Sequence, residues 1–304
     1  TKTVFINRLP SYYVNVIPQG LYNIFIPPLL SIKSFLYQIK RDAKLLDNIH
    51  INQYYGLIVP SQVKQGFGIP ADGVNPIRDM FNAVAPRYDF LNGLLSAGFD
   101  KYWRKAAVDE LEPIANHVYL DVATGTADIA LELALRQSSP SHIIGVDFSK
   151  TMLELGNEKV AARGRESSIQ LLPGAAENLP LKNDSFDGAI SAFGARNFAN
   201  LNHGIREIHR VLKPQGKIVI LEFSFPQNGL LQWFYRQYFG KVLPVLGRMI
   251  SRHKSAYSYL PDSVEGFPKG EAFVSILKEN GFESVGFKEL TFGITTIYTG
   301  LKHG

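Results

Sequence analysis

A regular alternation of apolar, strand-like runs with helical segments between residues 118 and 222 most constrains the fold of this chain. The strand-like runs are 118–123, 142–146, 169–172, 186–192 and 217–222. The helical patterns between them are 128–137, 150–163 (with Ser149 at the N-cap position) and 201–212. Two last runs, 285–290 and 294–300, predict a closing β-hairpin. This order predicts an α/β fold with a mostly parallel sheet that helices cover on both faces.

The composition excludes several kinds of site. The chain has 304 residues, of which 45% are hydrophobic and 19% charged, so it can bury a sizeable core. It contains no cysteine, which rules out disulfides, a thiolate nucleophile and zinc or iron–sulfur centres held by cysteine. Histidine, aspartate and glutamate show no ligand spacing, so we expect no metal.

The net charge of +5 belongs entirely to the first 70 residues, which contain seven basic and two acidic side chains. Residues 71–304 contain 25 of each sign and lack the positive field that phosphate binding favours, so we expect no nucleic-acid partner. We therefore divide the chain into an extension, 1–70, and a catalytic domain, 71–304. The extension is either a poorly ordered addition or a segment that docks on a membrane surface or a partner. Its most apolar run, 21–32, is too short to span a bilayer.

The loop after the first strand predicts a cationic ligand. In an open α/β sheet, ligands bind at the carboxyl ends of the strands. This loop, DVATGTAD at 121–128, has one glycine, Gly125, and begins and ends with Asp121 and Asp128. A dinucleotide site would show G-x-G-x-x-G, and two carboxylates face a pyrophosphate badly. S-adenosylmethionine, which carries an ammonium and a sulfonium and no phosphate, suits the loop better.

The next two loops add a nucleoside site. Asp147 ends the second strand, where a carboxylate can accept both ribose hydroxyls, although NAD enzymes place an acid there too. Ala175 and Ala176 follow the third strand, and their small side chains would let an adenine ring lie against the backbone. Taken together, the loops favour the methyl donor over NAD.

Two longer segments make the pattern specific. They are FNAVAPRYDFLN at 81–92 and RVLKPQGKIVILEFS at 210–224, and between them lie GVDFS, AENLP and FGARN. From about 76 to 302 the chain resembles the UbiE family, the C-methyltransferases of menaquinone and ubiquinone biosynthesis. The resemblance implies a class I S-adenosylmethionine-dependent methyltransferase fold, which is Rossmann-like with seven strands and an antiparallel C-terminal hairpin.

The resemblance also implies donor contacts. By motif position these are Thr126, Asp147, Ala175 and Ala176, beside Asp121 and Gly125 of the first loop. The family often has a serine that contacts the donor where Ala192 stands; here the serine is its neighbour Ser191, which we assign to the donor site. The family usually has glycine at the position of Ala127.

The implied reaction is methylation of a prenylated hydroquinone, foremost demethylmenaquinol to menaquinol and then the ubiquinone-pathway benzoquinol. Loss of a hydroxyl proton makes a ring carbon nucleophilic. Arg196 of FGARN is the candidate that stabilises the resulting oxyanion; a structural ion pair is the alternative. Tyr88 and Asn92 are candidates for closing the site, and packing alone is the alternative for Tyr88. The rival functions are methylation of another lipid-like or small acceptor, NAD-linked oxidation and a non-catalytic scaffold.

An insertion at about 225–262 is rich in aromatic and basic side chains. It predicts an apolar substrate cap whose rim faces anionic lipid headgroups. We therefore expect a cytoplasmic enzyme at the inner face of the membrane, with a homo-oligomer left open.

Deleting residues 1–70 should leave binding of S-adenosylmethionine intact, because none of the predicted donor residues lies in this segment. Titration calorimetry of the truncated and full-length proteins measures this. A truncated protein that no longer folds would contradict the division at residue 70.

Overall fold

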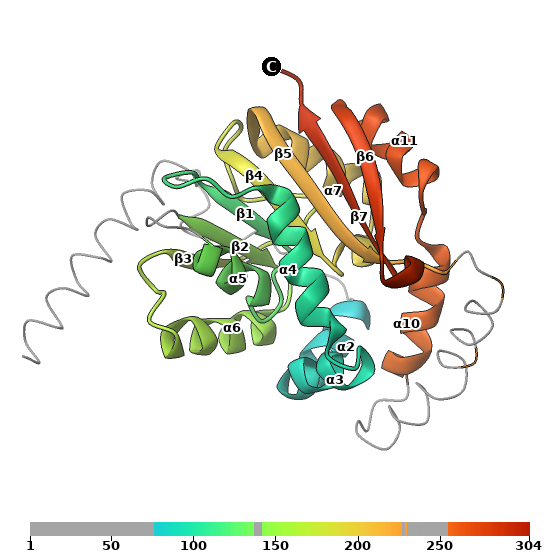
Figure 1. Ribbon diagram of the computed structural model, residues 1–304. Coiled ribbons are helices and arrows are strands. Elements are labelled where there is room, and N and C mark those ends of the chain that lie inside the picture. The colour runs from blue at the N-terminus through green and yellow to red at the C-terminus, as the bar shows by residue number, and fades with distance from the viewer. Residues whose placement is uncertain (1–75, 137–141, 227–228, 230–236, 238–254) are drawn as a thin grey trace, which may run out of the picture. The chain divides into compact units, whose positions relative to one another are not determined.

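The computed structural model describes residues 76–136, 142–226, 229, 237 and 255–304 (Figure 1). The predicted extension, 1–70, and most of the predicted cap insertion, 225–262, lie outside the described residues.

The described residues form one seven-stranded sheet of order β3-β2-β1-β4-β5-β7-β6. Its strands are β1 Tyr119–Val122, β2 Ile143–Asp147, β3 Ile169–Pro173, β4 Phe186–Ala192, β5 Leu212–Phe223, β6 Phe282–Leu290 and β7 Thr295–Lys302. The first five strands pair in parallel, and β7 runs antiparallel between β5 and β6. This confirms the predicted fold class and the C-terminal hairpin.

Helices cover both faces of the sheet (Figure 1). They are α2 Pro76–Val84, α3 Tyr88–Leu95, α4 Phe99–Leu111, α5 Asp128–Arg136, α6 Lys150–Ala162, α7 Leu201–Val211, α10 Ser255–Gly266 and α11 Glu271–Glu279. The short turns are η4 Ala85–Arg87, η5 Ala195–Asn197 and η7 Thr291–Gly293. One hydrophobic core joins the sheet to α7 and α11, and a second joins it to α4 and α5. In the part of the chain that is described, no helix is both long and apolar enough to cross a membrane.

The structure confirms the helix N-cap that the sequence predicts between β2 and α6. The Oγ of Ser149 accepts a hydrogen bond from the backbone N–H of Met152 at 3.2 Å, as the predicted N-cap requires. β5 differs from the prediction because it begins at Leu212 instead of 217. Leu212 pairs with Phe186 and Lys217 with Gly188, so the intervening residues bulge out of the ladder. Gln215 takes a left-handed φ of 65° in this bulge.

The carboxyl edge of the parallel strands is where α2, α3 and α10 gather, at the lower end of the sheet in Figure 1. α2 contacts both α6 and α10, and α3 contacts α4. α2, α3 and α10 therefore cover the edge at which the sequence predicts the ligand. From here on, we call these three helices the cap.

Candidate active site

The loop after β1 is held in shape by a buried carboxylate. Asp121 is 1% exposed, and its Oδ2 accepts hydrogen bonds from Thr124 Oγ1 at 2.6 Å and from the backbone N–H of Ala130 at 3.2 Å. The loop needs this support because Ala123, Gly125 and Ala127 all have positive φ values. At Ala127, φ is 66°, a conformation that favours glycine, so the backbone there is strained.

Asp147 joins this loop to the end of the neighbouring strand. The carboxylate is buried, and its Oδ2 accepts from the backbone N–H of Gly125 at 2.8 Å. Its Oδ1 accepts from the backbone N–H of Ser149 at 2.8 Å. The structure thus brings Asp121, Gly125 and Asp147 together at one edge, where the sequence places the donor.

Burial disfavours the ionised form of these two carboxylates. Desolvation raises the pKa of Asp121 to about 7 and that of Asp147 to about 6, and hydrogen bonds oppose the shift only in part. The neighbouring charges of Asp147 and Asp128 raise the pKa of Asp121 further. A ligand that carries positive charge would favour the ionised carboxylates, whereas a pyrophosphate would oppose them.

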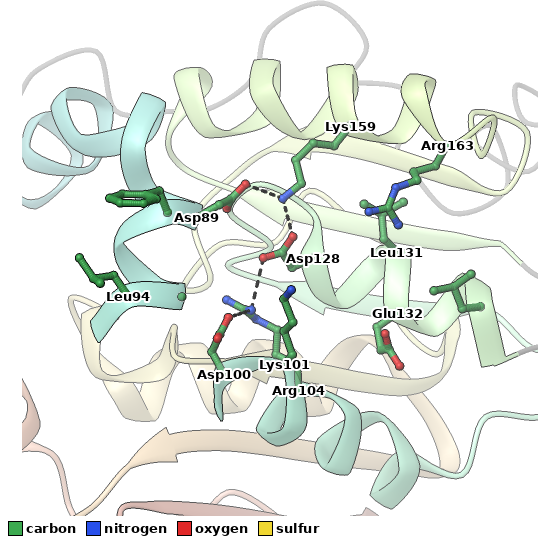
Figure 2. Close-up of a pocket in the computed structure, with 13 residues that line it drawn as sticks. Asp89, Leu94, Asp100, Lys101, Arg104, Asp128, Leu131, Glu132, Lys159 and Arg163 are labelled. Atoms are coloured by element: carbon green, nitrogen blue, oxygen red, sulfur yellow. Dashed lines mark hydrogen bonds and ion pairs between the residues drawn. The ribbon is translucent and has the colours of Figure 1, made fainter. Parts of the chain in front are cut away.

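The cap is hydrogen-bonded to the loops predicted to bind the donor. Asn82 of α2 accepts from Ser149 Oγ at 2.6 Å, and Asp89 of α3 accepts from Thr126 Oγ1 at 2.7 Å. Lys159 of α6 donates to Asp89 at 2.8 Å and to Thr126 at 3.0 Å (Figure 2 shows Asp89 and Lys159). Sequence reasoning missed Asn82 and Lys159, because nothing local links residues so far apart.

Tyr88 and Asn92, predicted to close the site, both lie on α3. Tyr88 packs edge-on against Phe81 with ring centres 6.2 Å apart, and Phe81 packs edge-on against Phe148 at 6.1 Å. This chain of rings ties the cap to the residue that follows Asp147. Among the described residues, no hydrogen bond joins Tyr88 or Asn92 to Arg196, the residue predicted to stabilise the oxyanion. Their predicted role in closing the site stays a prediction.

Arg196, in η5 just after β4, forms an ion pair with Glu222 near the end of β5. The two side chains are 7% and 1% exposed, and Arg196 Nη1 lies 2.9 Å from Glu222 Oε2. The same nitrogen donates to the carbonyl of Phe193 at 2.5 Å, and the guanidinium lies 5.4 Å from the centre of the Phe223 ring. Arg196 Nε is buried without a hydrogen-bond partner in the described part of the chain. The ion pair that the sequence analysis gave as the alternative is therefore present, and the role of Arg196 toward an oxyanion stays a prediction.

Glu222 was missed, although it follows the rule that identified Asp121 and Asp147, namely an acid at the carboxyl end of a buried strand. Another contact lies beside it: Tyr259 of α10 donates to Asn197 Oδ1 at 2.9 Å, which ties α10 to η5. The region after β4 is therefore covered from the side of α10.

The remaining residues that were predicted to bind the methyl donor differ in solvent exposure. Ala175 is half-buried, and Ala176 is 8% exposed, beside Gly174, whose N–H donates to the carbonyl of Asp147 at 2.9 Å. Ser191 is fully buried, and its Oγ has no hydrogen-bond partner among the described residues. Its assignment to the donor stays a prediction.

A groove of about 770 Å³ lies beside the donor loop, between α3, α4, α5 and α6 (Figure 2). Acidic and basic side chains alternate along it: Arg104 pairs with Asp100 at 2.5 Å and with Asp128 at 3.4 Å, and Asp128 also pairs with Lys159. The groove contains none of the residues predicted to bind the donor. Within the described residues, no group of three or more His, Asp or Glu side chains is placed to hold a metal ion.

A sheet of this order, with an acidic, single-glycine loop after β1, defines a class I S-adenosylmethionine-dependent methyltransferase. The chain belongs to the ubiE/COQ5 methyltransferase family, whose family model matches residues 71–302. It is a UbiE-type C-methyltransferase of menaquinone or ubiquinone biosynthesis, which confirms the prediction from the sequence.

Named relatives match over the same domain. The chain is 48% identical to the ubiquinone/menaquinone biosynthesis C-methyltransferase UbiE of Geotalea daltonii, over 74% of this chain and 96% of that one. It is 40% identical to the demethylmenaquinone methyltransferase of Bacteroides fragilis, over 74% and 92%.

Solved structures share the fold alone. A SAM-dependent methyltransferase from Thermotoga maritima has a TM-score of 0.53 at 21% identity, and covers 74% of this chain and 99% of its own. Phosphoethanolamine N-methyltransferase 2 of Haemonchus contortus, solved with S-adenosyl-L-methionine, has a TM-score of 0.50 at 16% identity, over 66% and 52%.

Replacing Asp121 with Asn keeps an oxygen acceptor for Thr124 and Ala130 but removes the ionisable group. The folded-state pKa of Asp121 is raised from 3.8 to about 7, so between these values the unfolded chain releases a proton that the folded chain keeps. Wild-type stability from this group therefore falls as the pH rises. In urea unfolding without donor, the stability of Asp121→Asn relative to wild type should grow from about pH 4 to about pH 7 and then level off. A difference that does not change with pH would contradict the assignment.

Proposed function

We propose that this enzyme transfers the methyl group of S-adenosylmethionine to a ring carbon of a prenylated hydroquinone, with demethylmenaquinol as the principal acceptor. The observation that carries this is the pair of buried carboxylates, Asp121 and Asp147, at the carboxyl ends of neighbouring strands in a domain of this family. The printed names of the relatives supply the acceptor class.

The donor site fits a cation by its chemistry. Asp121 and the small-residue loop around Gly125 and Thr126 would receive the aminoacyl end, where the ammonium favours ionisation of the carboxylate. Asp147 would accept the ribose hydroxyls, since both its oxygens are already aligned by backbone N–H groups. Ala175 and Ala176 would line the adenine. When bound, the sulfonium supplies an electrophilic methyl group.

The residues beyond the donor loops serve the acceptor. Loss of one hydroxyl proton spreads negative charge from the quinol oxygen onto the ring carbon. The electron pair of that carbon then forms the new bond to the methyl group, while the bond from the methyl group to the sulfonium sulfur breaks and S-adenosylhomocysteine leaves. The ring regains its aromatic state by losing the proton of the same carbon. Arg196 would stabilise the oxyanion through its charge and its unpartnered Nε–H, while Glu222 holds the guanidinium in place.

The prenyl tail of the acceptor implies work at a membrane surface. A long isoprenoid chain partitions into the bilayer, so the enzyme must meet its substrate at the interface as a peripheral protein. We propose this association without a nucleic-acid partner or a bound metal.

A direct assay tests the function. Purified protein, S-adenosylmethionine with a labelled methyl group and chemically reduced demethylmenaquinone should yield menaquinol with the label on the ring, detected by mass spectrometry. Omitting the reductant should abolish transfer, because the quinone lacks the nucleophilic carbon. Calorimetry should show binding of S-adenosylmethionine and none of NADH; the reverse result would favour an oxidoreductase.

Removing Arg196 should abolish turnover while donor binding persists. Because Arg196→Ala alone leaves the buried Glu222 without its partner, the variant to use is Arg196→Ala with Glu222→Gln. We expect kcat to fall by about 10²-fold or more, with the donor Kd unchanged by calorimetry. The control is Arg136→Ala, which should keep normal turnover. It breaks the ion pairs that Arg136 of α5 makes with Asp109 of α4 and with Glu132 of its own helix. Near-normal turnover in the folded double variant would leave Arg196 with a structural role only.

A further inference from the structure

Five large apolar side chains are exposed on the first turns of α4 and the two elements next to it. They are Phe90 and Leu94 of α3, Phe99 and Tyr102 of α4, and Phe292 of η7, with exposures of 63%, 43%, 49%, 53% and 80%. We call this set the aromatic corner. Grouped apolar exposure of this kind is uncommon on a protein surface that has no partner.

Trp103 connects the parts of the corner. Its ring stacks on Phe99 with centres 6.1 Å apart, and its Nε1–H donates to Thr291 Oγ1 of η7 at 2.7 Å. On the other side, Ser96 at the end of α3 donates to Asp100 of α4 at 2.7 Å. The two helices and the η7 turn therefore meet around the first turns of α4.

The backbone of η7 is strained. Thr291 and Phe292 have φ values of 49° and 58°, and Gly293 follows at 87°. A bulky side chain in the left-handed region is a genuine outlier that the surrounding structure must hold in place. Here the Trp103 hydrogen bond holds the turn, and the result is a phenylalanine that points away from the core. Burial of the Phe292 ring by a partner would offset that strain.

The charges along α4 indicate the nature of this partner. The corner end of the helix exposes Lys101 and Lys105, while Asp100 is buried against Arg104. The exposed acids Asp109 and Glu112 lie at the opposite end. Two more exposed acids border the corner: Asp89, which pairs with Lys159, and Glu289, which lies beside Gly293 of η7. With Asp89 paired, the corner presents aromatic side chains beside Lys101 and Lys105, the combination that sits in the headgroup region of an anionic bilayer.

The corner also lies near the carboxyl edge of the sheet, which carries the proposed donor site. α3 carries both Phe90 and Asp89, and Asp89 is hydrogen-bonded to Thr126 of the donor loop. We propose that the aromatic corner docks the enzyme on an anionic lipid bilayer, with Phe292 and its neighbours inserted among the headgroups. The proposal rests on the prenylated acceptor of the proposed function, and it assigns the docking surface to these residues.

Flotation with phosphatidylcholine vesicles, with and without phosphatidylglycerol and free of quinol, tests the docking directly. Wild type should bind the anionic vesicles, and binding should weaken with added salt. Phe292→Asn, which suits the left-handed backbone, and the pair Phe99→Ser with Tyr102→Ser should each weaken vesicle partition by about tenfold. Ile114→Ser is the matched control, because Ile114 is 57% exposed in the loop before β1, at the opposite edge of the sheet.

Separate measurements distinguish the outcomes. Turnover of a water-soluble, short-tailed hydroquinone should be unchanged in all these variants, and its absence in wild type would count against the proposed function and not against the docking. Vesicle binding by Phe292→Asn and by the Phe99/Tyr102 variant that equals wild type would overturn the docking surface. So would a wild-type dimer in gel filtration that these variants convert to monomer, since the corner would then be a subunit interface.

Discussion

The hydrogen bonds to Asp147 are the interactions on which the rest of the site depends. One carboxylate oxygen accepts the N–H of Gly125 and the other accepts the N–H of Ser149, so a single side chain fixes the first loop and the start of α6. Burying this group costs free energy, as the raised pKa of about 6 shows. The loop after β1 has three residues with left-handed φ values and needs a hydrogen-bond acceptor to hold its shape. Asp147 can provide this acceptor because β1 and β2 are parallel neighbours whose carboxyl ends lie side by side.

The sequence predicted the parts of this molecule whose signals are local. Buried strands read as apolar runs, and Ser149 as a cap, so the sheet and its order of elements followed. The bulge at Gln215 was not predicted, because only the pairing of Leu212 and Lys217 with β4 makes it necessary. Long-range contacts were equally hidden: Lys159 meets Asp89 from 70 residues away, and no local pattern encodes that meeting.

Arg196 shows why residue type alone leaves a role open. From the sequence, a cation at the end of β4 was either an oxyanion partner or half of an ion pair. In the fold, Glu222 of the next strand pairs with Nη1 of the guanidinium, while Nε remains without a partner in the described residues. A buried guanidinium without an acid would be too costly, so the ion pair is a condition for burying the arginine at this position and does not compete with its proposed role toward the oxyanion.

The α3 helix links three functions through one rigid element. Its Asp89 contacts the donor loop, its Tyr88 packs into the ring cluster behind Asp147, and its exposed face contributes Phe90 and Leu94 to the aromatic corner. In the proposed docking, a membrane on the corner would act on the same helix that is hydrogen-bonded to the loop proposed for the donor. Since α3 and the donor loop share the Lys159 ion pairs, a displacement of the helix at the bilayer must break or move contacts of Thr126 and Asp128. The same contacts give donor binding a physical route to the docking surface, because an occupied loop would hold α3 in place.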